Sequence, residues 1–259
     1  ASIFKDHITQ SFLLSYAALI WAGRARLAQG KWRLLWIMMV LLSAYCIVFL
    51  LQGRTGYMTL ALLVLYAGFH FSRARMKGVA AGVALLILAS FAAFHYSRPF
   101  EQRIQIAETQ ALNWQNNRPV GESDSIGLRL EFYTNSFRVW LKHPVWGVGT
   151  GGFARAYRHQ VKGTGEIATD NPHNDMLLIV VQIGLIGALA LFYLYFCAWQ
   201  AAAALPPLYQ YLARGLVILY VSGGLVDAVL FSHTESMAFA WLVALVYAGL
   251  PALQDKTCV

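Results

Sequence analysis

Long apolar runs constrain this chain more than any other feature of its sequence. Hydrophobic residues make up 58% of the 259 residues and charged residues only 12%, whereas soluble domains carry roughly 25% charged residues. Several runs approach the roughly 20 apolar residues that a helix needs to cross the hydrocarbon core of a bilayer. The sequence therefore predicts an all-α, polytopic membrane protein built as a helical bundle.

Seven runs are predicted to span the membrane, at residues 8–23, 34–51, 55–71, 78–96, 174–200, 212–231 and 236–252. The basic connectors 24–33 and 72–78 are predicted to be cytoplasmic, because cytoplasmic loops carry an excess of Lys and Arg. The turn 51–57 and the segment 97–172 then fall on the outer side. The net charge of +8 follows in part from the same rule, so it requires no nucleic-acid partner.

The segment 97–172 divides the chain into three predicted parts. Residues 1–96 hold the first four spans, and residues 173–259 hold the last three. The segment between them is too long for a simple connector, and its many aromatic residues argue against disorder. Residues 100–112 and 127–142 have helical character, which predicts a large outer loop that contains amphipathic helices.

The potentially reactive groups gather at the outer ends of the predicted spans. They are Arg54, Arg129, Arg138, His173 and Asp227, the last of which falls in the outer third of its span. No charge lies near the middle of any predicted span. Ion and proton pathways usually place ionisable residues there, so this pattern weakens an interpretation as a pump or channel.

The arginines have two interpretations. Arg54 lies in the tight turn GRTG and either extends to lipid headgroups or binds phosphate oxygens with its planar fork of donors. Arg129 and Arg138 are either solvated charges on an amphipathic helix or further phosphate ligands. Of these two, Arg129 is favoured for phosphate binding because it stands where the apolar face of its helix begins.

His173 stands at the start of the apolar run 174–200. Asn171 suits the N-cap position and Pro172 the first helical position, which predicts His173 in the first turn. A helix start offers free N–H groups and a positive dipole end, which favour a neutral imidazole and attract anions. We interpret His173 as a general base beside a bound phosphate; the alternative is an interfacial histidine with no chemical role.

The glycines of HPVWGVGTGGF spell GxGxxG without its usual context. A dinucleotide fingerprint needs a preceding strand within a βαβ unit, which a helical membrane protein does not offer. The stretch instead predicts a helix stop and a flexible turn that begins at Pro144. The three cysteines are scattered, and no motif indicates a metal site.

Three stretches together resemble the O-antigen ligase and polymerase superfamily. They are RTG at 54–56, GLRLEFYTNSFRVWLKHPVWGVGTGGF at 127–153 and PHNDMLLIVVQIGLIGAL at 172–189. The resemblance implies a GT-C-like membrane glycosyltransferase that needs no metal or other cofactor. Such an enzyme moves a glycan from undecaprenyl diphosphate to lipid A–core oligosaccharide on the periplasmic face of the bacterial inner membrane.

The resemblance also implies roles for individual residues. Arg54 and Arg129 would hold the donor diphosphate, and His173 would activate the acceptor hydroxyl. Arg138 and Asn174 would contribute further substrate contacts. Ligases of this superfamily have more spans than the seven predicted here, so an N-terminal portion is expected to precede this sequence.

Three other functions remain open from the sequence. A polymerase of the same superfamily would extend another lipid-linked repeat, and an oligosaccharyltransferase would modify protein side chains. A transporter of lipid-linked glycans would use the arginines for binding and catalyse no reaction. The sequence does not separate these possibilities from a ligase.

Overall fold

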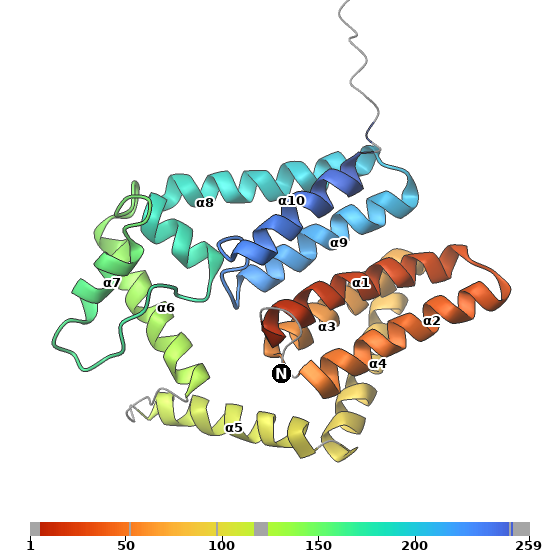
Figure 1. The fold of residues 1–259 in the computed structure, drawn as a ribbon, viewed down its shortest axis with the longest axis horizontal. Helices are drawn as coiled ribbons and strands as arrows, with labels where there is room; N and C mark the ends of the chain where they lie inside the picture. The colour runs from red at the N-terminus through yellow and green to blue at the C-terminus, as the bar shows by residue number, and fades with distance from the viewer. Residues whose placement is uncertain (1–5, 52, 97, 117–123, 249, 251–259) are drawn as a thin grey trace, which may run out of the picture. The chain divides into compact units, whose positions relative to one another are not determined.

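The computed structural model describes residues 6–51, 53–96, 98–116, 124–248 and 250, and the regular structure within them is helical. The helices are α1 (His7–Leu27), α2 (Gly30–Tyr45), α3 (Arg54–Phe71), α4 (Arg75–Tyr96), α5 (Arg98–Gln115), α6 (Ser125–Lys142), α7 (Phe153–Val161), α8 (Asp175–Ala201), α9 (Pro207–Gly224) and α10 (His233–Tyr247). A π-helical segment, Cys46–Leu51, extends α2, and a 3₁₀ turn, Ala202–Ala204, follows α8. The all-α prediction is confirmed for the described residues (Figure 1).

Three helical segments are long and apolar enough to cross a membrane by length and composition. They are Gly30–Leu51, Arg75–His95 and Asp175–Ala204. They coincide with three of the predicted spans and establish a membrane protein. The other four predicted spans fall on α1, α3, α9 and α10, which are shorter or less apolar, so the count of seven is not confirmed. The end of the last predicted span, at 251–252, lies outside the described residues.

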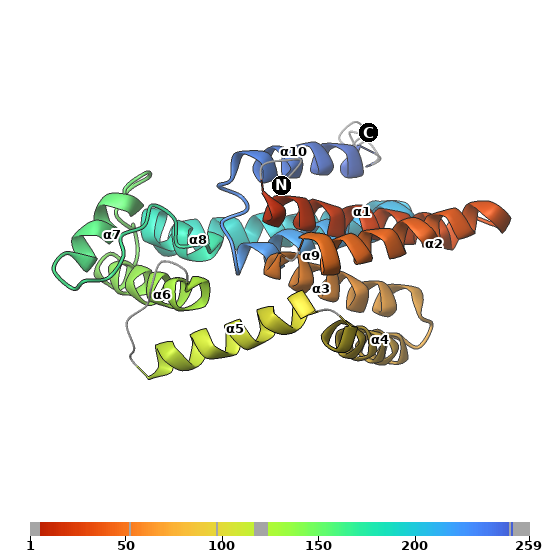
Figure 2. The same cartoon turned by 60° about the horizontal axis from the view of Figure 1, so that its bottom comes forward.

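The chain forms two compact units, which are described separately. The first comprises the described parts of residues 1–86, 194–222 and 233–259. Within it α1 packs along α2 and α3, and Figure 2 shows these three helices side by side. Close approach of α1 and α3 depends on small residues, because a Cβ at Gly56 would overlap Ser11. The buried Tyr16 hydroxyl donates to the Leu212 carbonyl of α9 at 3.1 Å and fastens α1 to that helix.

The second unit comprises the described parts of residues 87–193 together with 223–232. Its core joins α6, α7, the start of α8 and the turn that follows α9. The core side chains are Phe132, Val139, Phe153, Tyr157, Val161, Leu178, Val181 and Ala228. From the predicted outer loop, α6 and α7 therefore pack against the beginning of α8. The predicted division of the chain at residues 96 and 172 separates membrane-spanning parts from an outer loop, and it stays a prediction.

The predicted span 212–231 requires a correction, because its helix ends early. α9 stops at Gly224, and residues 225–232 form a turn before α10 begins at His233. The Gly223 carbonyl closes the helix end by accepting from the Asp227 N–H at 2.9 Å. A Cβ at Gly224 would meet the Asp175 carboxylate at 2.6 Å. Asp227 consequently lies in a turn between helices and not within a span.

The predicted span 174–200 is also not one continuous helix. α8 changes direction sharply near its start, at Gly184, where φ is +71° and ψ is −160° (Figure 1). The break leaves backbone carbonyls of α8 without helical hydrogen-bond donors. Residues 144–152, here called the glycine turn, follow α6 and supply donors to these carbonyls. The N–H groups of Val148 and Gly149 donate to the carbonyls of Val181 and Gln182 at 2.8 and 2.9 Å. The predicted helix stop after α6 is thus confirmed. The glycine turn that follows it forms hydrogen bonds with the backbone at the break in α8.

Candidate active site

His173 lies just before α8 and not in its first turn, which corrects the prediction. The helix begins at Asp175, and the side chain of Asn174 caps it by accepting from the Leu177 N–H at 2.9 Å. Asn171, the predicted cap, instead accepts from the His173 N–H at 2.8 Å and forms a tight turn around Pro172. His173 has φ of +53°, which is uncommon for a residue other than glycine.

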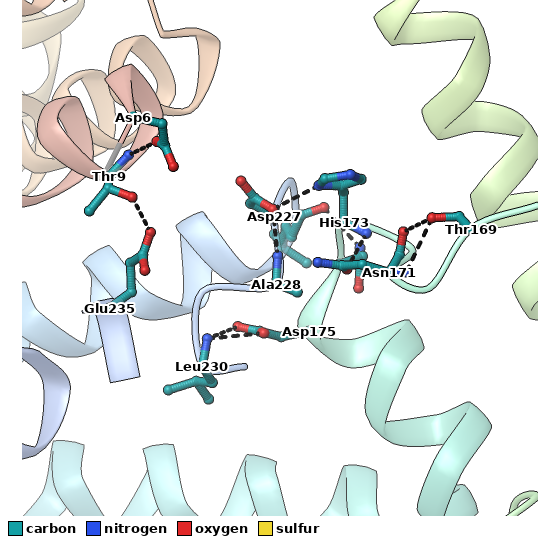
Figure 3. A network of polar contacts seen from close by, with 12 residues as sticks. Asp6, Thr9, Thr169, Asn171, His173, Asp175, Asp227, Ala228, Leu230 and Glu235 are labelled. Carbon is teal, nitrogen blue, oxygen red and sulfur yellow. Dashed lines mark hydrogen bonds and ion pairs between the residues drawn. The ribbon is translucent and has the colours of Figure 1, made fainter. Parts of the chain in front are cut away.

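The imidazole of His173 is paired with a carboxylate 54 residues further along the chain. Its Nδ1 lies 3.0 Å from Oδ1 of Asp227 (Figure 3). The Ala228 N–H donates to the same oxygen at 2.9 Å and fixes its position. When Asp227 accepts a hydrogen bond from the protonated Nδ1, Nε2 carries a lone pair and is able to accept a proton. The His173 side chain is 37% exposed, so the protein does not enclose the imidazole.

The charge state of Asp227 suits this pairing. Burial raises its pKa, but the hydrogen bond and charge of His173, the Ala228 N–H and the Arg129 guanidinium together lower it more. The pKa of Asp227 therefore lies below its usual value, and the carboxylate is ionised at neutral pH. An ionised partner stabilises the imidazolium that forms when His173 accepts a proton.

Tyr133 and Asn174 hold the loops around the His173–Asp227 pair. The Tyr133 hydroxyl lies within hydrogen-bonding distance of the carbonyls of His173 and Leu225, at 3.1 and 3.2 Å. The Asn174 amide donates to the Leu225 carbonyl at 2.8 Å while its oxygen caps α8. Asn174 is buried, and both ends of its amide are engaged within the protein. These bonds connect α6, the start of α8 and the turn after α9.

One of the three predicted arginines acts electrostatically on the pair. Arg129 is half-buried on α6, and its positive charge contributes to the lowered pKa of Asp227. Burial raises the pKa of Tyr133, and the charge of Arg129 offsets that rise only in part. Arg138 is exposed and donates to Asn135 at 3.3 Å. Arg54 begins α3 in the first unit, so its place relative to the pair stays a prediction.

The sequence indicates Asp227 as a potentially reactive group but does not predict its pairing with His173, and it does not predict a role for Tyr133. No local pattern links His173 with a residue 54 positions later, because the contact depends on where α9 ends. The sequence signal for that end was the Gly223–Gly224 pair, since adjacent glycines often terminate regular structure. Among the described residues, no group of three or more His, Cys, Asp and Glu side chains is arranged to hold a metal ion.

The chain is thus an all-helical membrane protein with a histidine–carboxylate pair and an arginine beside the start of a broken helix. The family model for O-antigen ligase matches residues 37–192, from within α2 to within α8. This match covers more than half of the chain, and the chain belongs to the O-antigen ligase family. That family comprises glycosyltransferase-like ligases and polymerases, which use lipid-linked glycans. No curated protein matches the chain.

Proposed function

We propose that this protein is an inverting, metal-independent glycosyltransferase of the ligase type. It moves an O-antigen glycan from undecaprenyl diphosphate to lipid A–core oligosaccharide at the periplasmic face of the inner membrane. The observation that carries the proposal is the pairing of His173 with an ionised Asp227 beside Arg129. Membership of the O-antigen ligase family supports the substrate class.

In the proposed reaction, Nε2 of His173 removes the proton from the acceptor hydroxyl as its oxygen attacks the anomeric carbon. The bond from that carbon to the diphosphate breaks, and undecaprenyl diphosphate leaves with the electron pair. Asp227 stabilises the imidazolium, and Arg129 together with Arg54 stabilises the charge that develops on the leaving phosphate. Attack opposite the leaving group inverts the anomeric centre. Tyr133 and Asn174 act as positioning residues, since Asn174 is already bonded within the protein.

The direct test is reconstitution of the full chain with a lipid-diphosphate glycan and purified rough lipopolysaccharide. We expect the lipopolysaccharide to be elongated at the same rate with and without a chelator. Elongation of a second lipid-linked glycan would identify a polymerase, and glycosylation of an added protein would identify an oligosaccharyltransferase. Donor translocation without any transfer would contradict the proposal and favour a transporter.

Replacing Arg129 with Gln tests the proposed diphosphate contact. We expect the rate of transfer to fall by roughly 10- to 150-fold, because hydrogen bonds to charged groups contribute about 1.5–3 kcal/mol. Arg54→Gln is expected to act in the same direction. Arg158→Gln is the matched control, because this arginine pairs with Asp170 at 2.7 Å and lies outside the proposed site. Normal transfer by both the Arg129 and Arg54 variants would disprove the diphosphate role.

Replacing Asp227 with Asn tests the role of the carboxylate. The shape is kept, but the charge that stabilises the imidazolium is lost, and we expect transfer to slow by roughly 10- to 150-fold. The apparent affinity for the donor should change little, since Asp227 acts through His173. The control is Asp170→Asn, which removes an exposed carboxylate from the segment that leads to His173. Equal rates for these two variants would show that the pair is merely structural.

A further inference from the structure

A basic groove lies apart from the His173–Asp227 pair, in the second unit. It has a volume of about 470 Å³ and is formed by the end of α6, the glycine turn and α7. Its polar lining consists of Lys142, His143, Arg155, His159 and Gln160, with no carboxylate. The volume falls in the roughly 300–1,000 Å³ range of small-ligand sites. The groove is therefore large enough for a headgroup and carries charge of a single sign.

The surrounding sequence has the same charge bias. Between residues 137 and 162 there are five Lys or Arg residues and two histidines, but no Asp or Glu. Arg158 pairs with Asp170, which lies outside this stretch. Among the described residues, no carboxylate forms an ion pair with Lys142 or Arg155. Lys142 instead donates to Gln160 at 2.6 Å, which holds the ammonium group at the groove.

Exposed apolar side chains adjoin the groove along the chain. Trp146 is 75% exposed, and Leu141 and Val145 are about half exposed. Leu141 directly precedes Lys142 and Trp146 directly precedes Gly147, both of which line the groove, and Val145 lies two residues from His143 and Gly147. Tryptophan is enriched at membrane–water interfaces, and basic residues beside exposed apolar groups are typical of surfaces that bind anionic membranes. In this membrane protein, the combination indicates a ligand with an anionic head and an apolar body.

We propose that this groove binds the phosphate headgroup of an anionic phospholipid at the membrane surface. Lys142 and Arg155 contact the phosphate, and Trp146 enters the interfacial layer of the bilayer. Such binding would hold the α6–α7 region of the second unit against the membrane. The proposal does not depend on glycan transfer, because none of the residues assigned to the reaction lines the groove.

The test is native mass spectrometry of the purified full chain with equal amounts of phosphatidylglycerol and phosphatidylcholine. We expect preferential retention of phosphatidylglycerol, reduced about fivefold by Arg155→Gln, because each basic residue near an anionic surface contributes about 1 kcal/mol. Arg158→Gln is the matched control, three residues along the same helix, and is expected to change retention less than twofold. Thermal unfolding of each variant establishes that folding is intact.

Three outcomes would overturn the proposal. Equal retention of the two lipids would show that the groove does not select an anionic headgroup. Equal losses in the Arg155 and Arg158 variants would show that only diffuse surface charge matters. Displacement of phosphatidylglycerol by glycerol phosphate at equal concentration would identify a site for soluble phosphates. A Trp146→Ser variant should weaken lipid retention while leaving glycerol phosphate binding unchanged.

Discussion

A His173→Asn variant is expected to transfer glycan roughly 10²–10⁴-fold more slowly than the wild type, the range that a positioned general base contributes. Asp227 engages Nδ1 of the His173 imidazole, so Nε2 is the nitrogen that accepts the proton of the acceptor hydroxyl. Asparagine has no basic nitrogen, so the proton must leave by a slower route. Asparagine also tolerates the positive φ of +53° at this position, so the loop keeps its conformation.

The measurements are the turnover rate and the binding of the lipid-linked donor by the same preparation. We expect donor binding within about twofold of the wild type, because the base acts on the acceptor and the arginines hold the diphosphate. His233→Asn, at the start of α10, is the control for a histidine to which no role in the reaction is assigned, and it should retain normal turnover. Turnover of His173→Asn within about tenfold of the wild type would contradict the role of His173 as the general base. Unchanged movement of the lipid-linked glycan across the membrane by this variant would instead indicate a transporter.

The helical architecture could be predicted because it depends on local composition. α2 and α4 are apolar along most of their lengths after a basic first turn, and bilayer thickness alone requires such runs to be long. The amphipathic helices α5 and α6 were predicted within a few residues at 100–112 and 127–142, since their apolar positions recur with the helical period. α7 was not predicted. Its nine residues include two arginines and a histidine, and it is held by Phe153 and Tyr157 in a core made of distant segments.

The candidate site was predicted only in part, for the same reason. The position of His173 beside the start of an apolar run was visible in the sequence, as was a nearby basic helix. Its positive φ and its contact with Asp227 were not visible, because both depend on how separate loops meet. Hydropathy predicted residues 225–231 as part of a span, whereas the helix ends at the Gly223–Gly224 pair and Asp227 lies in a turn. The local signal was present, but the apolar character of the surrounding run outweighed it.

The break in α8 was the feature least accessible to sequence reasoning. Gly184 lies in the run QIGLIG, where a glycine in a membrane helix is ordinary and predicts no interruption. The break is defined by the glycine turn, some 35 residues earlier, whose N–H groups occupy the carbonyls that the break frees. Leu185, just after the break, donates to the Pro144 carbonyl at 2.9 Å. The GxGxxG stretch therefore has a structural explanation, and no nucleotide is needed to account for its glycines.

A Gly184→Ala variant is expected to destabilise the protein by about 2–6 kcal/mol, which combines backbone strain with overpacking. The backbone at Gly184 has φ of +71°, and an added Cβ would overlap the Val145 carbonyl and approach the Trp146 nitrogen. Because these are backbone atoms held in the glycine turn, no side chain can rotate to make room.

The measurement is the unfolding midpoint of the full chain in a mild detergent. Gly149→Ala is the matched control, because Gly149 also has a positive φ, of +94°, but a Cβ there would meet nothing within 4 Å. This control should cost about 1–2 kcal/mol from backbone strain alone. The difference between the two variants therefore isolates the contact between the break in α8 and the glycine turn. Equal destabilisation would show that the two segments do not pack together, and the start of α8 would then lack the support that places His173 beside Asp227.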